Sequence, residues 1–395
     1  MRKAVFWENP RYRSTAALEG DIETRFLIVG GGITGVMCAW YLLQRGISPR
    51  DIVLLEARTI GDGSTGRSAG ILVTEPENEQ NVWWDVLEKK YGKKLIASYQ
   101  RAHLDALHAL KQLIVRGHIA CDAEAHYMLI LARDAAAAKV LVKDHEARRH
   151  AGINTEVLTG RSYASEFGGC GYIAAERDIE GLSVNPLALV QGIAIYLRRK
   201  GVRVFEHTPL VRALRGVAKT PRGSIDFEKV IYARGMAERL RGMDTFITTI
   251  AITHPLPRRT LRALRLDDRD MFCDAIGNQP FHYGKVTKHN RLLLGFGDIV
   301  TDKNVSEAKT HMPHVREILR FLKRVFPTHA FTIDSAWSAG YAISRSLVPL
   351  VRIGTGTAVV NGSGIQLSSI VAADYAVAKL LGKKHALDSL WQKSV

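Results

Sequence analysis

The sequence contains little cysteine, and its cysteines are not spaced as in zinc or redox motifs. Among its 395 residues only Cys38, Cys121, Cys170 and Cys273 are cysteines, and no two form a C-x-x-C pair. We therefore expect a reducing compartment and no metal site. The N-terminal segment also lacks the long apolar stretch of a secretory signal, which favours a cytoplasmic location.

Long hydrophobic runs are missing as well. The longest apolar stretch, FLIVGGGITGVMCAWYLL, falls short of the roughly 20 residues of a membrane span, and it contains four glycines. We therefore expect no transmembrane segment. Internal repeats and low-complexity linkers are absent too, so the length predicts a globular protein of about two or three domains.

Acidic residues are in deficit. The sequence has 55 Lys and Arg against 39 Asp and Glu, a formal net charge of +16. Such a charge attracts polyanions, but solvated basic helix faces, or a proteome that is basic throughout, are the explanation we favour. No zinc-finger, RNP or KH signature is present, so we do not expect nucleic acid as a partner, although the charge leaves it open. The sequence does not predict an oligomeric state.

The pattern that is present begins at Arg25. RFLIVG is typical of a buried parallel strand, ITGVMCAWYLLQRG of a helix, and DIVLLEA of a second strand. Between the first strand and the helix, Gly30, Gly32 and Gly35 form G-x-G-x-x-G, and Glu56 ends the second strand. A tight turn in any α/β protein could look similar. The strand, the helix and the carboxylate together favour a dinucleotide site, with Glu56 on ribose hydroxyls.

The rest of the chain predicts two discontinuous domains. Helical periodicity follows residue 82, antiparallel strand patterns fill residues 247–298, and a strand, glycine turn and helix close the chain. We expect a mixed α/β (overall α+β) fold with a Rossmann-like dinucleotide-binding domain on a parallel sheet. The second domain should be an inserted substrate domain on an antiparallel sheet with helices. The predicted boundaries are 1–80, 166–240 and 331–395 for the first domain, and 81–165 and 241–330 for the second.

Three segments together resemble a known family. LEGDIETRFLIVGGGITG, LLEARTIGDGSTGRSAG and NPLALVQGIAIYLRRKGVRVFEHTP are similar to the D-amino-acid-oxidase-type (DAO) FAD-dependent oxidoreductases. The branch with gamma-glutamylputrescine, glycine and sarcosine oxidases is the most similar. The resemblance covers nearly the whole chain in the same order, and it implies an FAD enzyme.

The resemblance also implies positions that hold FAD. The glycine loop would face the pyrophosphate, the residues around Glu56 the adenosine ribose, and the loop before Gly70 the ribityl chain and flavin ring. Leu210 would contact adenine through its backbone, and the last glycine turn would lie at the pyrimidine edge, where a helix N-terminus stabilises the reduced flavin. The implied FAD-binding residues are Gly30, Gly32, Ile33, Thr34, Gly35, Glu56, Ala57, Arg58, Gly63, Ser64, Thr65, Arg67, Ser68, Ala69, Gly70, Leu210, Ala233, Gly235, Gly362, Ser363, Gly364, Ile365 and Gln366.

Three residues are candidates on the substrate side. His282 and Tyr283 lie where relatives place aromatic side chains facing the flavin, and strand alternation allows only one to point inward; we expect Tyr283. Arg345 could hold a substrate carboxylate bidentately. Lys285 could be the basic residue that some oxidases hold near the flavin to favour oxygen reduction.

Two departures from the family bear on cofactor and substrate. The segment GYAISRS has no cysteine where sarcosine oxidases attach flavin covalently, and Gln366 replaces their substrate-binding lysine. We therefore expect non-covalent FAD and a substrate other than sarcosine.

The main functional prediction is oxidation of the C–N bond of a small amine or amino acid by hydride transfer, with oxygen or another acceptor restoring the flavin. A 2-hydroxy acid or glycerol phosphate dehydrogenase, an enzyme acting on modified tRNA, and a flavin-binding subunit of a complex are the alternatives.

Overall fold

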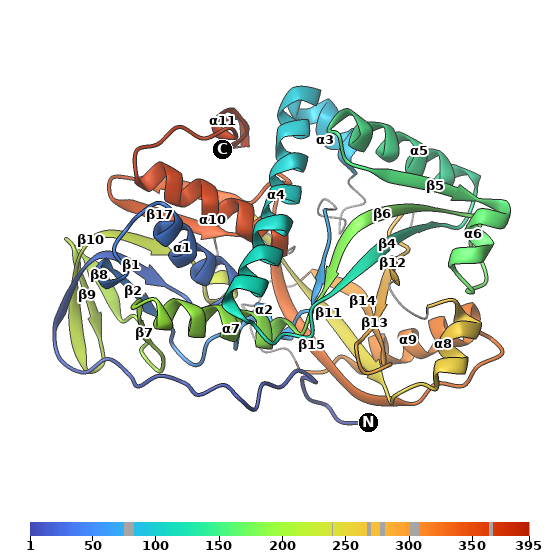
Figure 1. The fold of residues 1–395 in the computed structure, drawn as a ribbon, viewed down its shortest axis with the longest axis horizontal. Coiled ribbons are helices and arrows are strands. Elements are labelled where there is room, and N and C mark those ends of the chain that lie inside the picture. Colours follow the sequence, from blue (N-terminus) through green and yellow to red (C-terminus); the bar gives the residue numbers. More distant parts are fainter. Residues whose placement is uncertain are drawn as a thin grey trace.

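Two β-sheets organise the chain, and the long helix α4 (Lys93–Gly117) lies between them (Figure 1). The computed structural model describes residues 1–74, 83–238, 240–266, 270–276, 281–300, 309–362 and 366–394. The left half of Figure 1 holds the first sheet with α1 and α10, and the right half holds the second sheet with α5, α8 and α9. This arrangement is the expected mixture of parallel and antiparallel sheets with helices.

The first sheet has eight strands, in the order β16-β17-β10-β1-β2-β7, with β8 and β9 continuing from β10 as antiparallel strands. The contacts between β17, β10, β1, β2 and β7 are all parallel. Residues 26–29, the second half of β1, are buried throughout, as parallel strands covered on both faces require. The strands are β1 (Ile22–Val29), β2 (Ile52–Leu55), β7 (Arg203–Phe205), β8 (Arg212–Leu214), β9 (Val217–Thr220), β10 (Gly223–Tyr232), β16 (Leu350–Gly354) and β17 (Thr357–Asn361).

The second sheet has nine strands, in the order β15-β11-β14-β13-β12-β4-β6-β3, with β5 paired to β6. Its neighbours are antiparallel, apart from the parallel pair β12 and β4. Strands β13 and β14 form an antiparallel hairpin in the region of residues 247–298, where the sequence predicts antiparallel strands. The strands are β3 (Ile71–Leu72), β4 (Glu124–Ala132), β5 (Thr155–Thr159), β6 (Ala174–Ser183), β11 (Met243–Thr253), β12 (Asp270–Cys273), β13 (His282–Val286), β14 (Leu292–Val300) and β15 (Ile333–Ser344).

Local sequence chemistry accounts for the start of some helices. For example, Asn185 caps α7 by accepting from the backbone N–H of Ala188, and Pro186 takes the first helical position. Among the described residues, no helix is long and apolar enough to cross a membrane. The remaining helices are α1 (Ile33–Gln44), α2 (Ser64–Arg67), α3 (Trp84–Tyr91), α5 (Ala135–His150), α6 (Gly160–Glu166), α7 (Pro186–Arg199), α8 (Arg258–Leu264), α9 (Met312–Val325), α10 (Gln366–Leu380), α11 (Asp388–Ser394) and the 3-10 turns η1 (Pro49–Asp51) and η3 (Gly235–Ala237).

Strand pairing differs in part from the predicted domain boundaries. Strands β3, β6 and β15 lie in segments that we assigned to the dinucleotide-binding domain, yet all three pair within the second sheet. The chain therefore crosses between the sheets as many times as predicted, but three of the crossings lie at other positions: between β2 and β3, between β6 and β7, and between β15 and β16. Pairing partners are distant in sequence, so local patterns could not show this. The division into two domains itself stays a prediction.

Candidate functional site

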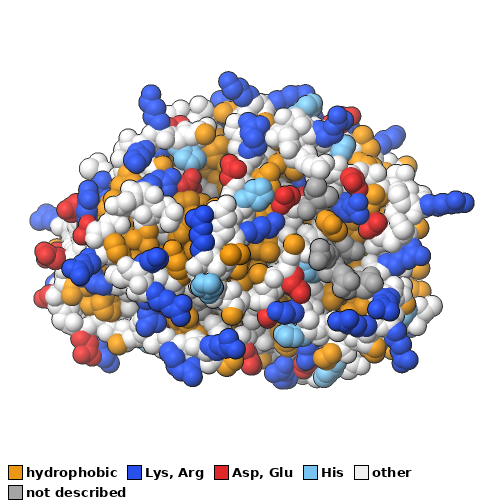
Figure 2. Space-filling view, in the orientation of Figure 1, with side chains coloured by type: hydrophobic (Ala, Val, Ile, Leu, Met, Phe, Trp, Pro, Cys, Tyr) orange, Lys and Arg blue, Asp and Glu red, His pale blue; other side chains and the backbone are white. Residues whose placement is uncertain are grey.

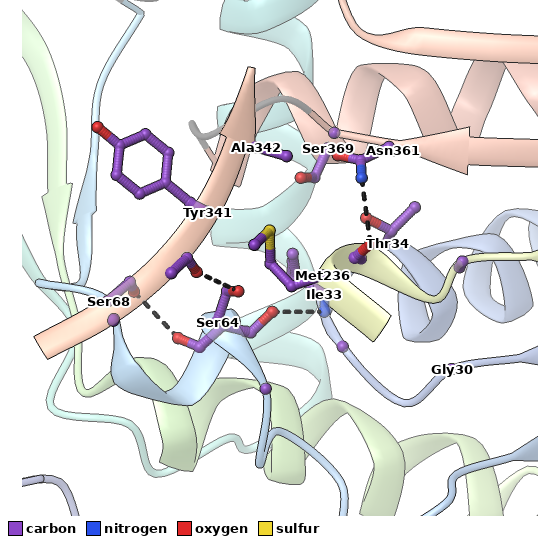
Figure 3. Close-up of a pocket in the computed structure, with 18 of the residues that line it drawn as sticks. Gly30, Ile33, Thr34, Ser64, Ser68, Met236, Tyr341, Ala342, Asn361 and Ser369 are labelled. Atoms are coloured by element: carbon purple, nitrogen blue, oxygen red, sulfur yellow. Dashed lines mark hydrogen bonds between the residues drawn. The ribbon is translucent and has the colours of Figure 1, made fainter. Parts of the chain in front are cut away.

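A cavity of about 680 Å³ is lined by residues from both sheets (Figure 3). Val29, Leu55, Ala233 and Asn361 place it at the carboxyl ends of β1, β2, β10 and β17. In doubly wound sheets, ligands bind at this edge, where the strand order reverses. The volume lies in the range of about 300–1,000 Å³ that is usual for cofactor and small-molecule sites.

The first wall of the cavity is the glycine turn between β1 and α1. Gly30 has a φ of 116°, and a Cβ there would overlap the carbonyl group of Ala233. A Cβ at Gly35 would overlap the carbonyl oxygen of Gly30, because α1 packs directly on the turn. Gly35 therefore shapes the turn without lining the cavity, whereas Gly30 and Gly32 line it.

The N-terminus of α1 faces the cavity. Gly32, Ile33 and Thr34 line it, and the backbone N–H of Ile33 donates to Oγ1 of Thr65 at 3.1 Å. No acidic side chain lies in the first turn of α1. The partial positive charge of this helix end is therefore left for a ligand, and phosphate is the group that such a helix end favours.

Glu56 lies at the end of β2 and lines the cavity. Its two oxygens accept from the backbone N–H groups of Gly31 (2.7 Å) and Arg58 (2.9 Å). Burial raises the pKa of Glu56, and the two backbone donors oppose that rise. Each oxygen keeps a second lone pair for a ribose hydroxyl. Further predicted residues that line the cavity are Ala57, Arg58, Leu210, Ala233 and Gly235.

The loop from Gly63 to Gly70 forms the next part of the wall. Gly63, Ser64, Thr65, Ser68, Ala69 and Gly70 line the cavity. The hydroxyl of Ser64 donates to the carbonyl oxygen of Gly340 in β15 at 2.6 Å, so the loop is tied to the second sheet. Arg67 is not part of the lining; its guanidinium donates to the carbonyl oxygen of Asp62 at 3.3 Å.

The C-terminal glycine turn is described in part. Gly362 lines the cavity, and so does Ser369 in the first turns of α10. The predicted residues Ser363, Gly364 and Ile365 lie outside the described residues, as does the side chain of Gln366. Asn361 connects this turn to η3, which follows β10, because its side-chain amide donates to the carbonyl oxygen of Gly235 at 3.4 Å.

The opposite wall is the face of the second sheet. Tyr283 lines the cavity from β13, and its hydroxyl lies 3.2 Å from Oγ1 of Thr248 on β11. The ring fits because residue 295, on the neighbouring strand, is glycine: a Cβ there would overlap it. His282 faces the other side of the sheet and stacks on Phe321, with ring centroids 4.0 Å apart. Tyr283, and not His282, therefore lies on the cavity side of the sheet, and its role beside the flavin stays a prediction.

Lys285 and Arg345 are not placed as the sequence analysis expected. Neither lines the cavity. Lys285 is 1% exposed and donates to the carbonyl oxygens of Gly70 and Val184, both at 2.9 Å. Arg345 is exposed and pairs with Asp244 at 2.7 Å. The prediction of Arg345 as a carboxylate clamp in the cavity is therefore wrong, because β15 ends at Ser344 and the next side chain turns to solvent.

Sequence reasoning missed much of the second wall. Phe281 lies two residues before Tyr283, so alternation alone could have found it. The other lining residues reach the cavity only because of the way the strands pair, and their local sequence does not indicate that pairing. The missed lining residues of this wall include Met128, Thr248, Ile250, Cys273, Gly340, Tyr341 and Ala342, and Arg234, Met236 and Ser369 were missed on the side of the first sheet.

The cavity fits an extended dinucleotide better than a metal. Its first wall offers a glycine turn that excludes any Cβ, a helix N-terminus and a carboxylate, which are the groups that hold pyrophosphate and ribose. Within the described ranges, no group of three or more His, Cys, Asp or Glu residues could hold a metal ion.

Comparison with known proteins agrees with this geometry. The family model DAO, described as FAD dependent oxidoreductase, matches residues 25–378. Gamma-glutamylputrescine oxidoreductase of Escherichia coli is 26% identical over 388 residues, which cover 94% of this chain and 86% of the relative.

Two solved structures show the same fold. L-proline dehydrogenase from P. horikoshii has a TM-score of 0.78 and 19% identity, and the match covers 95% of this chain and 98% of the other. Glycine oxidase from Bacillus cereus has a TM-score of 0.72 and 16% identity over 93% of this chain and 98% of the other.

Proposed function

Since this chain belongs to the DAO family of FAD-dependent oxidoreductases, we propose that it oxidises the carbon–nitrogen bond of a small amine or amino acid. The enzyme uses FAD, as its family does. The names of the relatives point to nitrogen-containing substrates, since they include a gamma-glutamylputrescine oxidoreductase and a glycine oxidase.

One observation carries the proposal. A single cavity has the dinucleotide-type glycine turn on one side and an aromatic, hydroxyl-bearing sheet face on the other. A cofactor held by the first wall therefore meets a substrate held by the second wall in the same enclosed space. Placing two reactants side by side in this way is what the protein contributes to a flavin reaction.

The first wall would hold FAD through groups already described. The N-terminus of α1 would bind the pyrophosphate, and Glu56 would accept from ribose hydroxyls. When bound, FAD supplies a two-electron acceptor for the hydride that leaves the carbon next to nitrogen. The resulting imine is hydrolysed by water, and oxygen or another acceptor takes the electrons. We keep the expectation that FAD is bound non-covalently.

The second wall would position the substrate. The hydroxyls of Tyr283, Tyr341 and Thr248 offer hydrogen bonds, and apolar side chains surround them. Of the described lining residues, the charged ones are Glu56 and Arg58 after β2, and Arg234 after β10. The sheet face that would meet the substrate is therefore uncharged over its described part. Such a face suits the neutral form of an amine, from whose nitrogen lone pair the imine bond forms.

The net charge does not favour the tRNA alternative. On the face shown in Figure 2, Lys and Arg side chains spread over both halves of the molecule and do not form one continuous stripe. An RNA-binding surface would be expected to concentrate these charges beside the cavity.

The test is an anaerobic spectrum. Purified holoenzyme is mixed without oxygen with a panel of amines, amino acids, 2-hydroxy acids and glycerol phosphate, and flavin absorption is followed. Bleaching by an amine or amino acid is the expected result. Bleaching only by a hydroxy compound would refute the C–N proposal and leave FAD in place. Flavin bands that no compound bleaches would favour the RNA or subunit alternatives. Release of flavin from the denatured protein tests the absence of a covalent bond.

A further inference from the structure

The loop from Ser64 to Gly70 lines the cavity, and several of its backbone carbonyl groups accept hydrogen bonds from side chains that lie outside the cavity. The indole N–H of Trp337 donates to the carbonyl oxygen of Arg67 at 2.8 Å, and that of Trp7 donates to the carbonyl oxygen of Ser68 at 2.7 Å. Nζ of Lys285 donates to the carbonyl oxygen of Gly70 at 2.9 Å. Three side chains from distant segments thus hold three carbonyls within four consecutive residues.

These donors form one packed group. The rings of Trp7 and Trp337 meet edge to face with centroids 6.3 Å apart, and Nζ of Lys285 lies 5.2 Å from the Trp7 ring centroid. Trp7 is 7% exposed and Lys285 1%. Both line a separate cavity of about 260 Å³ and not the FAD cavity. The group therefore lies on the far side of the loop from the cofactor.

Trp7 reaches this position because the N-terminal arm, residues 2–8, is bound along the protein. The backbone N–H of Arg2 donates to the carbonyl oxygen of Asp334 at 2.7 Å, and Ala336 donates back to Arg2 at 2.9 Å. At the other end, the side chain of Asn185 donates to the carbonyl oxygen of Glu8 at 3.1 Å. The arm is thus attached to β15 and to the N-terminus of α7, on either side of Trp7.

Because peptide bonds are planar, the hydrogen bond from Trp7 also orients the peptide between Ser68 and Ala69 relative to the cavity. In a trans peptide the C=O and the following N–H point in opposite directions. A Ser68 carbonyl turned toward Trp7 therefore turns the N–H of Ala69, a cavity-lining residue, the other way. Without the hydrogen bond from Trp7, this peptide could rotate, and the N–H of Ala69 would no longer be held toward the cavity, where it could donate to a bound cofactor.

We infer that Trp7 and Lys285 are positioning residues for the FAD site, and that the N-terminal arm contributes to FAD binding by holding Trp7 against the loop. They act through the backbone of the loop and do not touch the cofactor. A lysine amine donates hydrogen bonds whether or not it is protonated, so the arrangement does not depend on its charge. The inference rests on FAD binding and not on the choice of substrate.

The test compares two matched tryptophan variants. Trp7→Phe keeps the ring and removes the N–H that holds Ser68. Trp391→Phe makes the same change at a tryptophan that is 3% exposed and whose N–H donates to the carbonyl oxygen of Pro349 at 2.9 Å, outside the cavity lining. FAD dissociation constants are measured by equilibrium dialysis, together with the visible absorption spectrum of the holoenzyme and the melting temperature of the apoprotein.

Both variants should lower the melting temperature, since each loses one buried hydrogen bond. Only Trp7→Phe should weaken FAD binding, by about three- to tenfold, and shift the flavin bands. Lys285→Met should weaken FAD binding in the same direction. If Trp7→Phe does not fold, Trp337→Phe replaces it in the test, because it removes the hydrogen bond to the carbonyl oxygen of Arg67 and should weaken FAD binding in the same way. The inference is overturned if those of Trp7→Phe, Trp337→Phe and Lys285→Met that fold bind FAD as tightly as Trp391→Phe does, with an unchanged flavin spectrum.

Discussion

Replacing Gly35 by alanine tests the structural basis of the FAD site. The new Cβ would lie 1.9 Å from the carbonyl oxygen of Gly30, and real Cβ atoms essentially never come closer than 3.0 Å to such an atom. The neighbour is backbone and cannot rotate away. Helix α1 must therefore move by at least 1.1 Å (3.0 minus 1.9) relative to the turn.

The movement has two costs. Overpacking of this kind lowers stability by about 1–3 kcal/mol. It also displaces the backbone N–H groups at the start of α1, and hydrogen bonds to charged groups are worth about 1.5–3 kcal/mol each. Loss of one such bond weakens FAD binding by about 10- to 100-fold. We expect both effects in Gly35→Ala.

The assay combines thermal unfolding of the apoprotein with equilibrium dialysis against FAD. Gly354→Ala is the matched control, because the nearest atom to its new Cβ is Cβ of Thr357 at 4.0 Å. The control should melt and bind FAD almost as the wild type does. If Gly35→Ala also kept wild-type melting and FAD affinity, α1 would not be packed against the turn, and our reading of the glycines would fail.

Three further predictions concern the remaining candidates. Tyr283→Phe should reduce turnover by about three- to tenfold, from one lost hydrogen bond, and leave FAD affinity unchanged; unchanged turnover would remove Tyr283 from the substrate wall. Arg345→Ala should change substrate KM by less than twofold and leave the melting temperature almost unchanged, since exposed ion pairs contribute little; a large rise in KM would contradict the placement of Arg345 outside the cavity. Burial lowers the pKa of Lys285 to about 7, against about 10.4 in an unfolded chain. The unfolded state therefore holds this proton more tightly, and the free energy of unfolding should rise with pH by up to about 1.4 kcal/mol per unit between about pH 7 and 10. Lys285→Met should abolish that rise, measured as the difference between variant and wild-type apoprotein unfolding at either end of this range; an equal difference at both ends would contradict it.

Much of the dinucleotide wall could be predicted from the sequence. The strand, Gly30, Gly32, Gly35, the helix and Glu56 lie within one short segment, and local chemistry dictates each of them. A turn with positive φ needs glycine, a helix N-terminus attracts phosphate, and a buried run of apolar residues forms a parallel strand. Strand alternation also limited the inward-facing residue to one of Tyr283 and His282, because a period of two is a local property, and Tyr283 is the one that lines the cavity.

The sequence failed where side chains meet across distant segments. Arg345 follows directly after a strand that faces the cavity, yet its side chain pairs with Asp244 in solvent, and only the path of the chain after Ser344 decides that. Lys285 was expected beside the flavin and instead lies behind Gly70. The alternation of residues along a strand predicts which face of the sheet a side chain lies on, but it does not predict which distant residues that side chain contacts.

The sequence by itself thus determined the cofactor class, because the groups that hold a dinucleotide are contiguous and follow from short-range backbone geometry. Only the tertiary structure decided which residues form the substrate wall, and that Trp7 and Trp337 donate hydrogen bonds to the loop. Those contacts join segments that are distant in the sequence: 61 residues separate Trp7 from Ser68, and 270 separate Trp337 from Arg67. They depend on the order in which strands pair, and that order is set by packing of the whole chain and not by any local run of residues.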